Sequence, residues 1–337
     1  MRLAVIGCGD ASFAMGVASR FVRRCRIVAA VDPDRGRRER FARRYRARGF
    51  AEWSRALEEV RPDAVYIAVP HDLHRPIALE CARAGTPVLL EKPVAHSLGE
   101  AELLRDEMPP GALVGVNYQY RYDPRAAALV EAGRDGALGA IRYATIEVPW
   151  FRGPEYFVQA GWHASRTRAG GGTLLTQASH ALDLVLAVCG EPAAATGRSW
   201  NRFHSVEVED LFMGVIETDA GAPVSIVSSM VSVPPSRLRV SLYGERGSLH
   251  YAGPSRATLR SRGVRVGAPI VLTQLHPYVA SLAGFRDWVE GRSEYRCPLE
   301  RAMPVMRACA ALYESAASGR TVALRDARDG PGATGWR

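Results

Sequence analysis

The sequence predicts an α/β fold of two domains, a doubly wound parallel sheet followed by an α/β domain with an open, largely antiparallel sheet. Three observations support this prediction. Short apolar runs alternate with helical patterns up to about residue 120, and a glycine-containing turn follows the first run. After Asp123-Pro124 the apolar runs become longer and are separated by turn signals. At 337 residues the chain also exceeds one ordinary hydrophobic core.

The first half alternates expected strands with expected helices. Strands are expected over residues 2–6, 27–31, 64–69, 88–90 and 113–116. Helices are expected from the glycine turn to about residue 22 and over residues 37–46, 76–84 and 98–106. The runs at 64–69 and 88–90 are apolar throughout, as in strands buried on both faces of a sheet. Such a βαβ series indicates a parallel sheet with helices on both sides.

The second half has a different pattern. Strands are expected over residues 141–148, 206–217, 224–233 and 238–243, and helices over 125–131, 174–188, 278–290 and 300–317. The sequence therefore predicts domains at residues 1–120 and 121–324. The last stretch, 325–337, is rich in Gly, Asp and Arg and is expected to be disordered.

The composition is typical of a soluble globular protein. Hydrophobic residues make up 47% and charged residues 23%, and no uninterrupted apolar run approaches the ~20 residues of a membrane-spanning helix. The N-terminus is too short and too weakly charged for a signal peptide, so we expect a cytoplasmic protein without membrane association. The six cysteines form no C-x-x-C pair, which argues against disulfides and against a metal site.

The net charge of +9 calls for a test of nucleic-acid binding. Eight arginines lie between Arg35 and Arg48, but Phe41 and Tyr45 fall four residues apart within this segment. That spacing is typical of a solvated helix that packs a narrow apolar stripe on its sheet. No helix-turn-helix or aromatic-rich pattern accompanies the charge, so no nucleic-acid partner is expected.

Lysine is almost absent from the chain. Of the 44 basic residues 43 are arginine, and the one lysine is Lys92. A GC-rich genome that favours arginine codons accounts for the bias, and the remaining lysine is then either an accident or required by its chemistry. A lysine amine can lose its proton near neutral pH when it is desolvated, whereas a guanidinium cannot. A site that needs a titrating amine cannot replace its lysine by arginine.

The first expected strand runs into Gly7-Cys8-Gly9-Asp10-Ala11-Ser12, which is close to the dinucleotide fingerprint G-x-G-x-x-G. The two glycines permit the tight turn and the approach of a pyrophosphate, and the third position, here Ser12, must be small. Asp32 ends the next strand, where a carboxylate binds the adenosine ribose hydroxyls and repels a 2′-phosphate. The pattern predicts a Rossmann domain that binds NAD through these residues. Arg35 and its neighbours leave NADP as the less favoured cofactor.

Two further strand ends carry polar residues. The third expected strand ends in Val69-Pro70-His71-Asp72-Leu73-His74 and the next in Leu90-Glu91-Lys92-Pro93. Ligands of open α/β sheets bind at the carboxyl ends of the strands, so both segments are expected on the cofactor side. The alternative is that Lys92 is a surface residue at the end of a strand and has no role in cofactor binding. The expected cofactor contacts in these segments are Pro70, His74, Glu91 and Lys92.

Together these segments resemble the Gfo/Idh/MocA family of oxidoreductases. The resemblance also includes the stretches 114–124, 170–184 and 311–320, and it covers about residues 1–323. It implies a Rossmann domain paired with an α/β substrate domain built on an open sheet. In such proteins the lysine of the E-K-P motif, often before a cis proline, touches both the reacting hydroxyl and the nicotinamide. By position that lysine is Lys92.

A second catalytic stretch is expected over residues 170–183. If it is helical, then Thr176, His180 and Asp183 share one face by their i, i+4, i+7 spacing. Many members of the family have an aspartate where this chain has Thr176, and a threonine can position a hydroxyl but cannot act as a base. Lys92 and His180 are therefore expected to move the proton, with His180 as the base near its ordinary pKa of ~6.5. The alternative is that His180 is a structural residue of a core helix whose hydrogen bonds are satisfied within the protein.

Aromatic residues precede this stretch, in Trp150-Phe151-Arg152, Tyr156-Phe157 and Gly161-Trp162-His163. Their arrangement resembles sugar dehydrogenases of the family, although they could equally form a domain interface. With Tyr120, they are expected to line the cleft. The expected substrate contacts are Lys92, Asn117, Tyr118, Arg121, Trp150, Arg152, Trp162, Thr176, Gln177 and His180.

The expected function is oxidation of a secondary ring hydroxyl of a sugar or sugar-bearing molecule to a ketone, with hydride transfer to NAD. A nucleotide sugar and an aminoglycoside intermediate both fit, and the arginine-rich composition suggests a GC-rich bacterium in which such enzymes often serve antibiotic biosynthesis. Two alternatives remain, an NADPH-dependent ketosugar reductase and a regulator that senses NAD without turnover. An open sheet face would favour a homo-oligomer, either a dimer or a tetramer.

Overall fold

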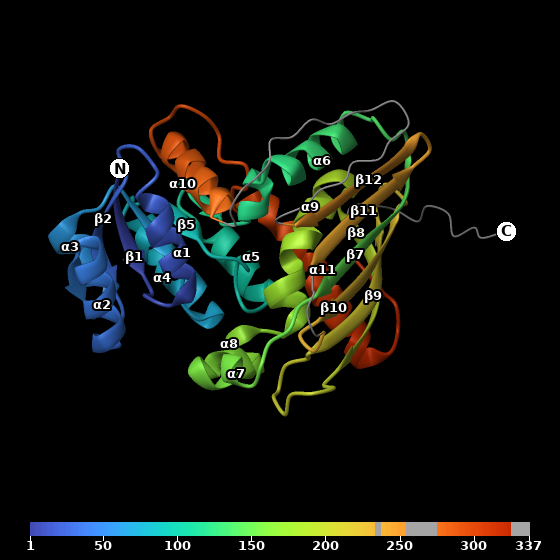
Figure 1. Ribbon diagram of the computed structural model, residues 1–337, viewed down its shortest axis with the longest axis horizontal. Helices are drawn as coiled ribbons and strands as arrows, with labels where there is room; N and C mark the ends of the chain where they lie inside the picture. Colours follow the sequence, from blue (N-terminus) through green and yellow to red (C-terminus); the bar gives the residue numbers. More distant parts are fainter. Residues whose placement is uncertain (233–236, 254–274, 325–337) are drawn as a thin grey trace.

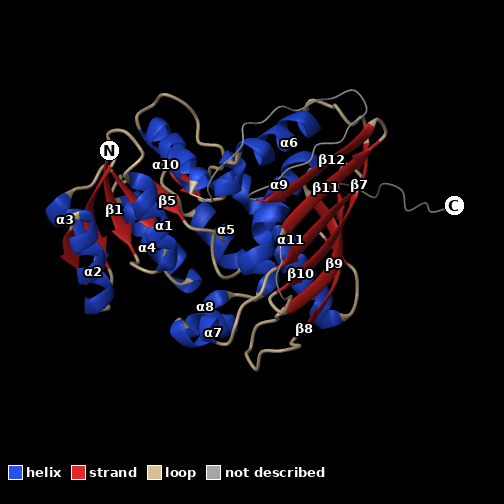
Figure 2. Cartoon of the chain, in the orientation of Figure 1, coloured by secondary structure: helices blue, strands red, loops and turns tan. Residues whose placement is uncertain are grey.

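Two α/β units lie side by side in the computed structural model, which describes residues 1–232, 237–253 and 275–324 (Figure 1). Helices lie on both sides of the strands in the first unit, whereas one large sheet dominates the second (Figure 2). The tail at 325–337, which the sequence suggests is disordered, lies outside the described residues.

The first unit contains a six-stranded parallel sheet in the order β3-β2-β1-β4-β5-β6. Its strands are β1 (Arg2–Ile6), β2 (Arg26–Val31), β3 (Arg48–Phe50), β4 (Ala64–Ile67), β5 (Val88–Leu90) and β6 (Val114–Val116). Its helices are α1 (Asp10–Ser19), α2 (Arg35–Tyr45), α3 (Trp53–Val60), α4 (His74–Arg83) and α5 (Leu98–Asp106), with the 3-10 turns η1 (His71–Leu73) and η2 (Gln119–Tyr122). The chain runs from β1 through β2 to β3 on one side and continues with β4 on the other side of β1. This reversal of strand order puts a ligand crevice at the carboxyl ends of β1 and β4.

Burial explains why the apolar runs become these strands. Leu3 in β1 and Ile67 in β4 are fully buried, as expected for strands covered on both faces. The predicted doubly wound parallel sheet is thus confirmed. The sequence did not predict β3, which has only three residues, of which Arg48 and Gly49 are exposed. It also did not predict the helix α3 that follows.

The second unit is built on a seven-stranded sheet in the order β12-β11-β7-β10-β9-β8-β13. Its strands are β7 (Ile141–Pro149), β8 (Pro192–Trp200), β9 (Leu211–Thr218), β10 (Pro223–Ser229), β11 (Leu238–Gly244), β12 (Gly247–Gly253) and β13 (Val322–Ala323). Strands β7 and β10 are parallel, and the other neighbouring pairs are antiparallel. The sheet is therefore mixed and mostly antiparallel, in agreement with the prediction.

Helices cover one face of this sheet and also lie beside it. They are α6 (Pro124–Arg134), α7 (Glu155–Gln159), η3 (Gly161–Ala164), α8 (Arg166–Ala169), the π-helical turn η4 (Leu174–Ala178), α9 (Ser179–Cys189), α10 (His276–Val289) and α11 (Leu299–Ser318). Helix α9 packs on β7 and β11, and α11 packs on β8. The sequence did not predict β8 because it contains three alanines and one glycine and lacks a run of β-branched residues. At Gly197 a Cβ would lie 2.6 Å from the Phe212 ring, so this strand lies too close to its neighbours for larger residues.

Helix α10 returns to the first unit, where it packs against α1 (Figure 1). Arg286 in α10 donates a hydrogen bond to the carbonyl oxygen of Arg23 at 2.7 Å, and Pro298 forms an isolated β-bridge with Gly115 of β6. Chain segments after residue 275 therefore contribute to both units. A domain boundary at residue 120 stays a prediction.

One helical run, Arg166–Cys189, has the length and mean hydropathy of a membrane span. Of its apolar window, 83% is buried inside the protein. A buried core helix meets the same criteria, and this run contains the central helix α9. The run therefore has a packing role within the second unit.

Gly7→Ala is expected to lower the free energy of unfolding by about 2–3 kcal/mol. Gly7 has a φ of +88°, and an added Cβ would lie 2.1 Å from the carbonyl oxygen of Ala68. Gly9→Ala is the matched control, because a Cβ at Gly9 meets nothing within 4 Å. Urea unfolding measures both variants, and equal stabilities of the two would contradict this account of the turn.

Candidate active site

The glycine turn joins β1 to α1 at the edge of the sheet where ligands bind. Ser12 is fully buried and its hydroxyl donates to the carbonyl oxygen of Gly7, so the third fingerprint position packs the helix on the strand. The space beside Gly9 is open, and Asp10 and Ala11 are exposed in the first turn of α1. An open helix N-terminus of this kind fits a dinucleotide pyrophosphate.

Asp32 lies at the end of β2, and backbone amides hold its carboxylate in place. Oδ2 accepts a hydrogen bond from the N–H of Cys8 at 2.9 Å, and Oδ1 accepts one from the N–H of Asp34 at 2.8 Å. Each oxygen keeps a second lone pair that can accept from a ribose hydroxyl. Arg35, the residue that left room for NADP, is paired with Glu39 at 2.6 Å. These residues fit a dinucleotide with a free ribose.

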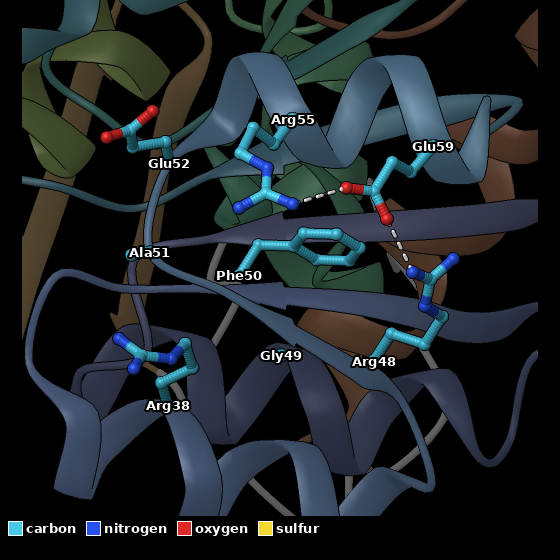
Figure 3. A pocket seen from close by; sticks show the side chains of 8 residues that line it. All are labelled: Arg38, Arg48, Gly49, Phe50, Ala51, Glu52, Arg55 and Glu59. Atoms are coloured by element: carbon cyan, nitrogen blue, oxygen red, sulfur yellow. Dashed lines mark hydrogen bonds and ion pairs between the residues drawn. The ribbon is translucent and has the colours of Figure 1, made fainter.

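A pocket of about 280 Å³ lies beside this position, between α2, β3 and α3 (Figure 3). The arginines that line it have partners within the chain. Arg48 and Arg55 both pair with Glu59, at 2.6 and 2.9 Å, and Arg38 donates to the carbonyl oxygen of Asp32 at 2.6 Å. The pocket contains none of the expected catalytic residues, so the reaction centre lies elsewhere.

Glu91 follows β5 and is the centre of a buried polar network. Oε1 accepts hydrogen bonds from the hydroxyl of Tyr66 and the amide of Asn117, both at 2.6 Å. Oε2 accepts from the backbone N–H of Lys92 at 3.2 Å, and the carbonyl of Asn117 accepts from Ser281 at 2.7 Å. The side chain of Asn117 uses its amide on Glu91 and its carbonyl on Ser281, so it supports Glu91, whereas the sequence suggested a substrate contact. Glu91 likewise holds Lys92 in place, and its carboxylate is not free for the cofactor.

His74, at the start of α4, is also buried beneath this edge. Its Nδ1 lies 2.8 Å from the carbonyl oxygen of Pro93, and its Nε2 lies 3.1 Å from that of Val69. Both ring nitrogens therefore face the chain and not a cofactor, contrary to the sequence expectation. The histidine ties the loop after β4, in which Pro70 is half-buried, to the Lys92-Pro93 segment. The Lys92-Pro93 peptide bond is cis, as the family resemblance implies.

Lys92 reaches from the first unit to the second. Its Nζ donates a hydrogen bond to the backbone carbonyl of Thr176 at 2.7 Å. Thr176 lies in the π-helical turn η4, where the usual i to i−4 hydrogen-bond pattern is interrupted. Burial lowers the pKa of Lys92 below its ordinary value, while Glu91 opposes the shift and Arg152 adds to it. The amine is therefore easier to deprotonate than a lysine in water.

His180 lies in the first turn of α9, directly after the π-helical turn. Its ring stacks on Tyr120 at 4.7 Å between centroids and meets the ring of Tyr118 edge-on at 5.8 Å. Its Nδ1 is buried and has no hydrogen-bond partner among the described residues. Burial, with a smaller effect from Lys92, lowers the pKa of His180 well below its usual range. The expectation of an ordinary histidine pKa is therefore wrong, and the imidazole is neutral at pH 7.

The neighbours of His180 differ in their availability. The hydroxyl of Thr176 donates to the carbonyl oxygen of Gly172 at 2.6 Å, which leaves only its lone pairs for a ligand. Gln177 is 2% exposed, and its Oε1 has no partner within the described ranges. Asp183 forms a bidentate pair with Arg121, with both contacts at 2.7 Å. Arg121 thus clamps η2 to α9, and this differs from its expected role as a substrate contact.

The aromatic segment packs against the loop that follows β4. Trp162 contacts His71 with ring centroids 4.7 Å apart, and Arg168 pairs with Asp72 at 3.2 Å. Trp150 is half-buried and lies where β7 ends, close to the start of this segment. The segment therefore spans from the second unit to the first beside the catalytic edge, as a cleft lining would.

A buried carboxylate that no sequence pattern indicates supports the glycine stretch. Glu209 accepts hydrogen bonds from the N–H groups of Gly172 and Leu174, at 2.8 and 3.0 Å, and from the hydroxyl of Tyr313 at 2.9 Å. A Cβ at Gly172 would lie 1.8 Å from the Glu209 carbonyl oxygen, which explains the need for glycine there. Glu209 is 37 residues from Gly172, so no local spacing could reveal the contact.

The arrangement brings an amine and an imidazole to one place. Lys92 and His180 both have lowered pKa values, and the open turn at Gly9 and the carboxylate of Asp32 lie on the same edge of the first sheet. Within the described ranges no group of three or more His, Cys, Asp or Glu side chains could hold a metal ion. The site can therefore hold a dinucleotide and exchange a proton with a ligand through Lys92 or His180.

Comparison with known proteins gives matches to both units. Residues 1–117 match the model of an oxidoreductase family with an NAD-binding Rossmann fold, and residues 126–250 match the GFO/IDH/MocA C-terminal domain. An inositol 2-dehydrogenase of Rubrobacter xylanophilus is 30% identical over 70% of this chain and 66% of its own length. A 1,5-anhydro-D-fructose reductase of Ensifer adhaerens is 26% identical over 78% of this chain and 80% of its own length.

Solved structures share the fold. The WlbA dehydrogenase from Bordetella pertussis, in complex with NADH and UDP-GlcNAcA, superposes with a TM-score of 0.88. It is 23% identical and covers 96% of this chain and 98% of its own. The fold and the site define an NAD(P)-dependent oxidoreductase with a Rossmann domain. The chain belongs to the Gfo/Idh/MocA oxidoreductase family.

The buried histidine His74 is expected to make stability fall in mild acid. Burial lowers its pKa to about 4, although nearby carbonyls favour the charged form. Below pH 6.5 the unfolded chain binds a proton that the folded chain does not, so this part of the stability is lost progressively as the pH falls toward 4. Its slope is at most about 1.4 kcal/mol per pH unit.

Urea unfolding at pH 7, 6 and 5 measures the slope for the wild type and for His74→Gln. The variant is expected to show a smaller decrease toward pH 5 because it lacks this titrating group. His276→Gln, at an exposed position, is the matched control and is expected to keep the wild-type slope. Identical slopes in the wild type and in His74→Gln would contradict the assignment.

Proposed function

We propose that this protein is an NAD-dependent dehydrogenase that oxidises a secondary ring hydroxyl of a sugar or sugar-bearing molecule to a ketone. A nucleotide sugar or an aminoglycoside-type intermediate would fit this class. The main support is one observation, the position of the Lys92 amine at the carboxyl edge of the first sheet, hydrogen-bonded to the turn that carries Thr176 and precedes His180. The names of the relatives, inositol 2-dehydrogenase and 1,5-anhydro-D-fructose reductase, are consistent with cyclic polyol and sugar substrates.

Two side chains of the site have separate roles in the proposed reaction. When bound, the nicotinamide would supply the acceptor for a hydride from the carbon being oxidised. Neutral His180 takes the hydroxyl proton, and no residue that the structure describes forms a competing hydrogen bond with its Nδ1. Lys92 donates to the substrate oxygen and polarises the C–O bond, while its contact with Thr176 fixes its direction. Tyr120 stacks on the imidazole and sets its plane.

Other contacts in this proposal come from the cleft. Tyr118, Thr176 and Gln177 lie beside His180, and Trp150, Arg152 and Trp162 approach from the aromatic segment. The hydroxyl of Tyr118 and Oε1 of Gln177 are buried without partners among the described residues, so each has hydrogen-bonding capacity left for a ligand. Such unsatisfied buried groups are costly unless a ligand or water occupies them.

NAD is the proposed cofactor rather than NADP. The carboxylate of Asp32 is fixed by two backbone amides and would repel a 2′-phosphate. The nearby guanidinium groups of Arg35 and Arg38 are both engaged within the chain. These two observations support the use of NAD in the oxidising direction.

A homo-oligomer, dimer or tetramer, is part of the proposal. The outer face of the second sheet exposes four large apolar side chains, Tyr143, Met213, Val215 and Val227. Met213 and Val227 are direct neighbours on β9 and β10. Exposed apolar side chains on one face of a sheet support a protein contact.

Lys92→Met is expected to lower kcat by about 10²- to 10⁴-fold, because it removes the group that holds and polarises the substrate oxygen. Lys92→Arg keeps the charge but cannot titrate, and it is expected to recover little of the loss. NADH fluorescence during a screen of sugars, amino sugars and nucleotide sugars measures turnover. Titration of each variant with NADH checks that the cofactor still binds.

The same screen separates the alternatives. Absence of hydride transfer from every sugar with both NAD and NADP, while NADH binds, would favour a cofactor-sensing regulator. Faster turnover of ketosugars with NADPH would favour a reductase. Wild-type turnover with NAD that Lys92→Met abolishes, at unchanged NADH affinity, supports the dehydrogenase.

A further inference from the structure

Arg152 is held at a fixed place beside the catalytic lysine. Its backbone N–H donates to the carbonyl oxygen of Met230 at 2.8 Å, and its carbonyl oxygen lies 2.9 Å from Nε2 of His204. His204 is itself buried and contacts Asp210 through Nδ1 and its backbone N–H, at 3.2 and 2.9 Å. An arginine whose backbone is anchored on both sides presents its side chain from a defined point.

The guanidinium of Arg152 has aromatic neighbours but no acidic one in the part of the chain that the structure describes. Its central carbon lies 5.1 Å from the ring centroid of Tyr156 and 5.9 Å from that of Trp150. Its Nε is buried without a hydrogen-bond partner, and it forms no ion pair within the described ranges. The carboxylate of Glu155 instead lies beside Gly153. A desolvated donor of this kind is costly to leave unpaired.

This charge acts on the reaction centre. Burial has the largest effect on three nearby groups: it lowers the pKa values of Lys92 and His163 and raises the pKa of Tyr120. The charge of Arg152 lowers all three pKa values, so Arg152 lies near each of these groups. The acidic group closest to Lys92 along the chain, Glu91, is already occupied by three internal donors. The cleft therefore has a positive group with no counter-charge from the described part of the chain.

We propose that Arg152 binds an anionic substituent of the substrate, a carboxylate or phosphoryl group carried close to the carbon that is oxidised. This inference rests on the proposed dehydrogenase function and selects acidic sugars within its substrate class. Arginine presents two parallel N–H donors that match the paired oxygens of either group. The aromatic rings near its central carbon do not pair with its N–H groups, and its Nε has no hydrogen-bond partner among the described residues.

The same charge disfavours cationic substrates. An aminoglycoside carries several ammonium groups, and a like charge at close range in a partly desolvated cleft costs binding energy. The inference therefore separates the two substrate types that fit the sequence equally. An acidic or nucleotide-linked sugar is preferred, and an amino sugar is rejected.

Binding to the NADH complex tests the proposal with matched ligands. UDP-glucuronate and UDP-glucose differ by one carboxylate, and glucose 6-phosphate and glucose differ by one phosphoryl group. For the pair that matches the natural anion, the ligand with the additional anionic group, called the charged ligand here, is expected to bind about 10- to 100-fold more tightly. Arg152→Gln is expected to remove this difference, so that the two ligands of the pair bind with similar affinities.

Two further variants sharpen the test. Arg152→Lys keeps the charge without the paired donors and is expected to restore only part of the preference. Arg168→Gln is the matched control, because this arginine lies in the same segment but pairs with Asp72. It is expected to keep the wild-type preference for the charged ligand.

The outcomes separate the two proposals. Equal affinities within both ligand pairs, or a preference that survives in Arg152→Gln, would overturn the anion site even if sugars are oxidised. An Arg152-dependent preference without turnover of any sugar would support the anion site and contradict the dehydrogenase. Tighter binding of an aminoglycoside such as kanamycin than of either charged sugar would also overturn the inference.

Discussion

One hydrogen bond joins the two halves of the reaction centre, from the Nζ of Lys92 to the backbone carbonyl of Thr176. Lys92 follows β5 of the parallel sheet that also carries the glycine turn, and Thr176 lies in the π-helical turn η4 that leads into α9 and His180. The contact therefore fixes the distance between the amine and the imidazole. It also removes the amine from water, and this desolvation lowers its pKa.

Each end of this bond is supported by a buried carboxylate. Glu91 holds the backbone of Lys92 and connects it to Tyr66 on β4 and, through Asn117, to the segment after β6. Glu209 holds the glycine stretch before the π-helical turn from the opposite side. Buried charges are tolerated only when their hydrogen bonds are satisfied, and both carboxylates meet this condition. The catalytic geometry thus depends on residues that no substrate touches.

The sequence predicted what depends on local pattern. The parallel sheet followed from continuous apolar runs, and Lys92 was recognisable because every other basic residue is arginine. Long-range contacts were not predictable in this way. His74, Asn117 and Arg121 are polar residues near strand ends, yet their side chains are used within the protein. The π-helical turn at Thr176 has no periodic signature, and the low pKa of His180 arises from burial that spacing does not reveal.

The unique lysine permits a direct measurement of the central claim, that Lys92 is desolvated beside the cofactor. Protein labelled with ¹³C-lysine and free of tag lysines should give a single Cε signal, which can be titrated by NMR. The account predicts a pKa below the ordinary lysine value, and a still lower one with NAD⁺ than with NADH because the oxidised nicotinamide is positive. An ordinary pKa that does not respond to either cofactor would contradict it.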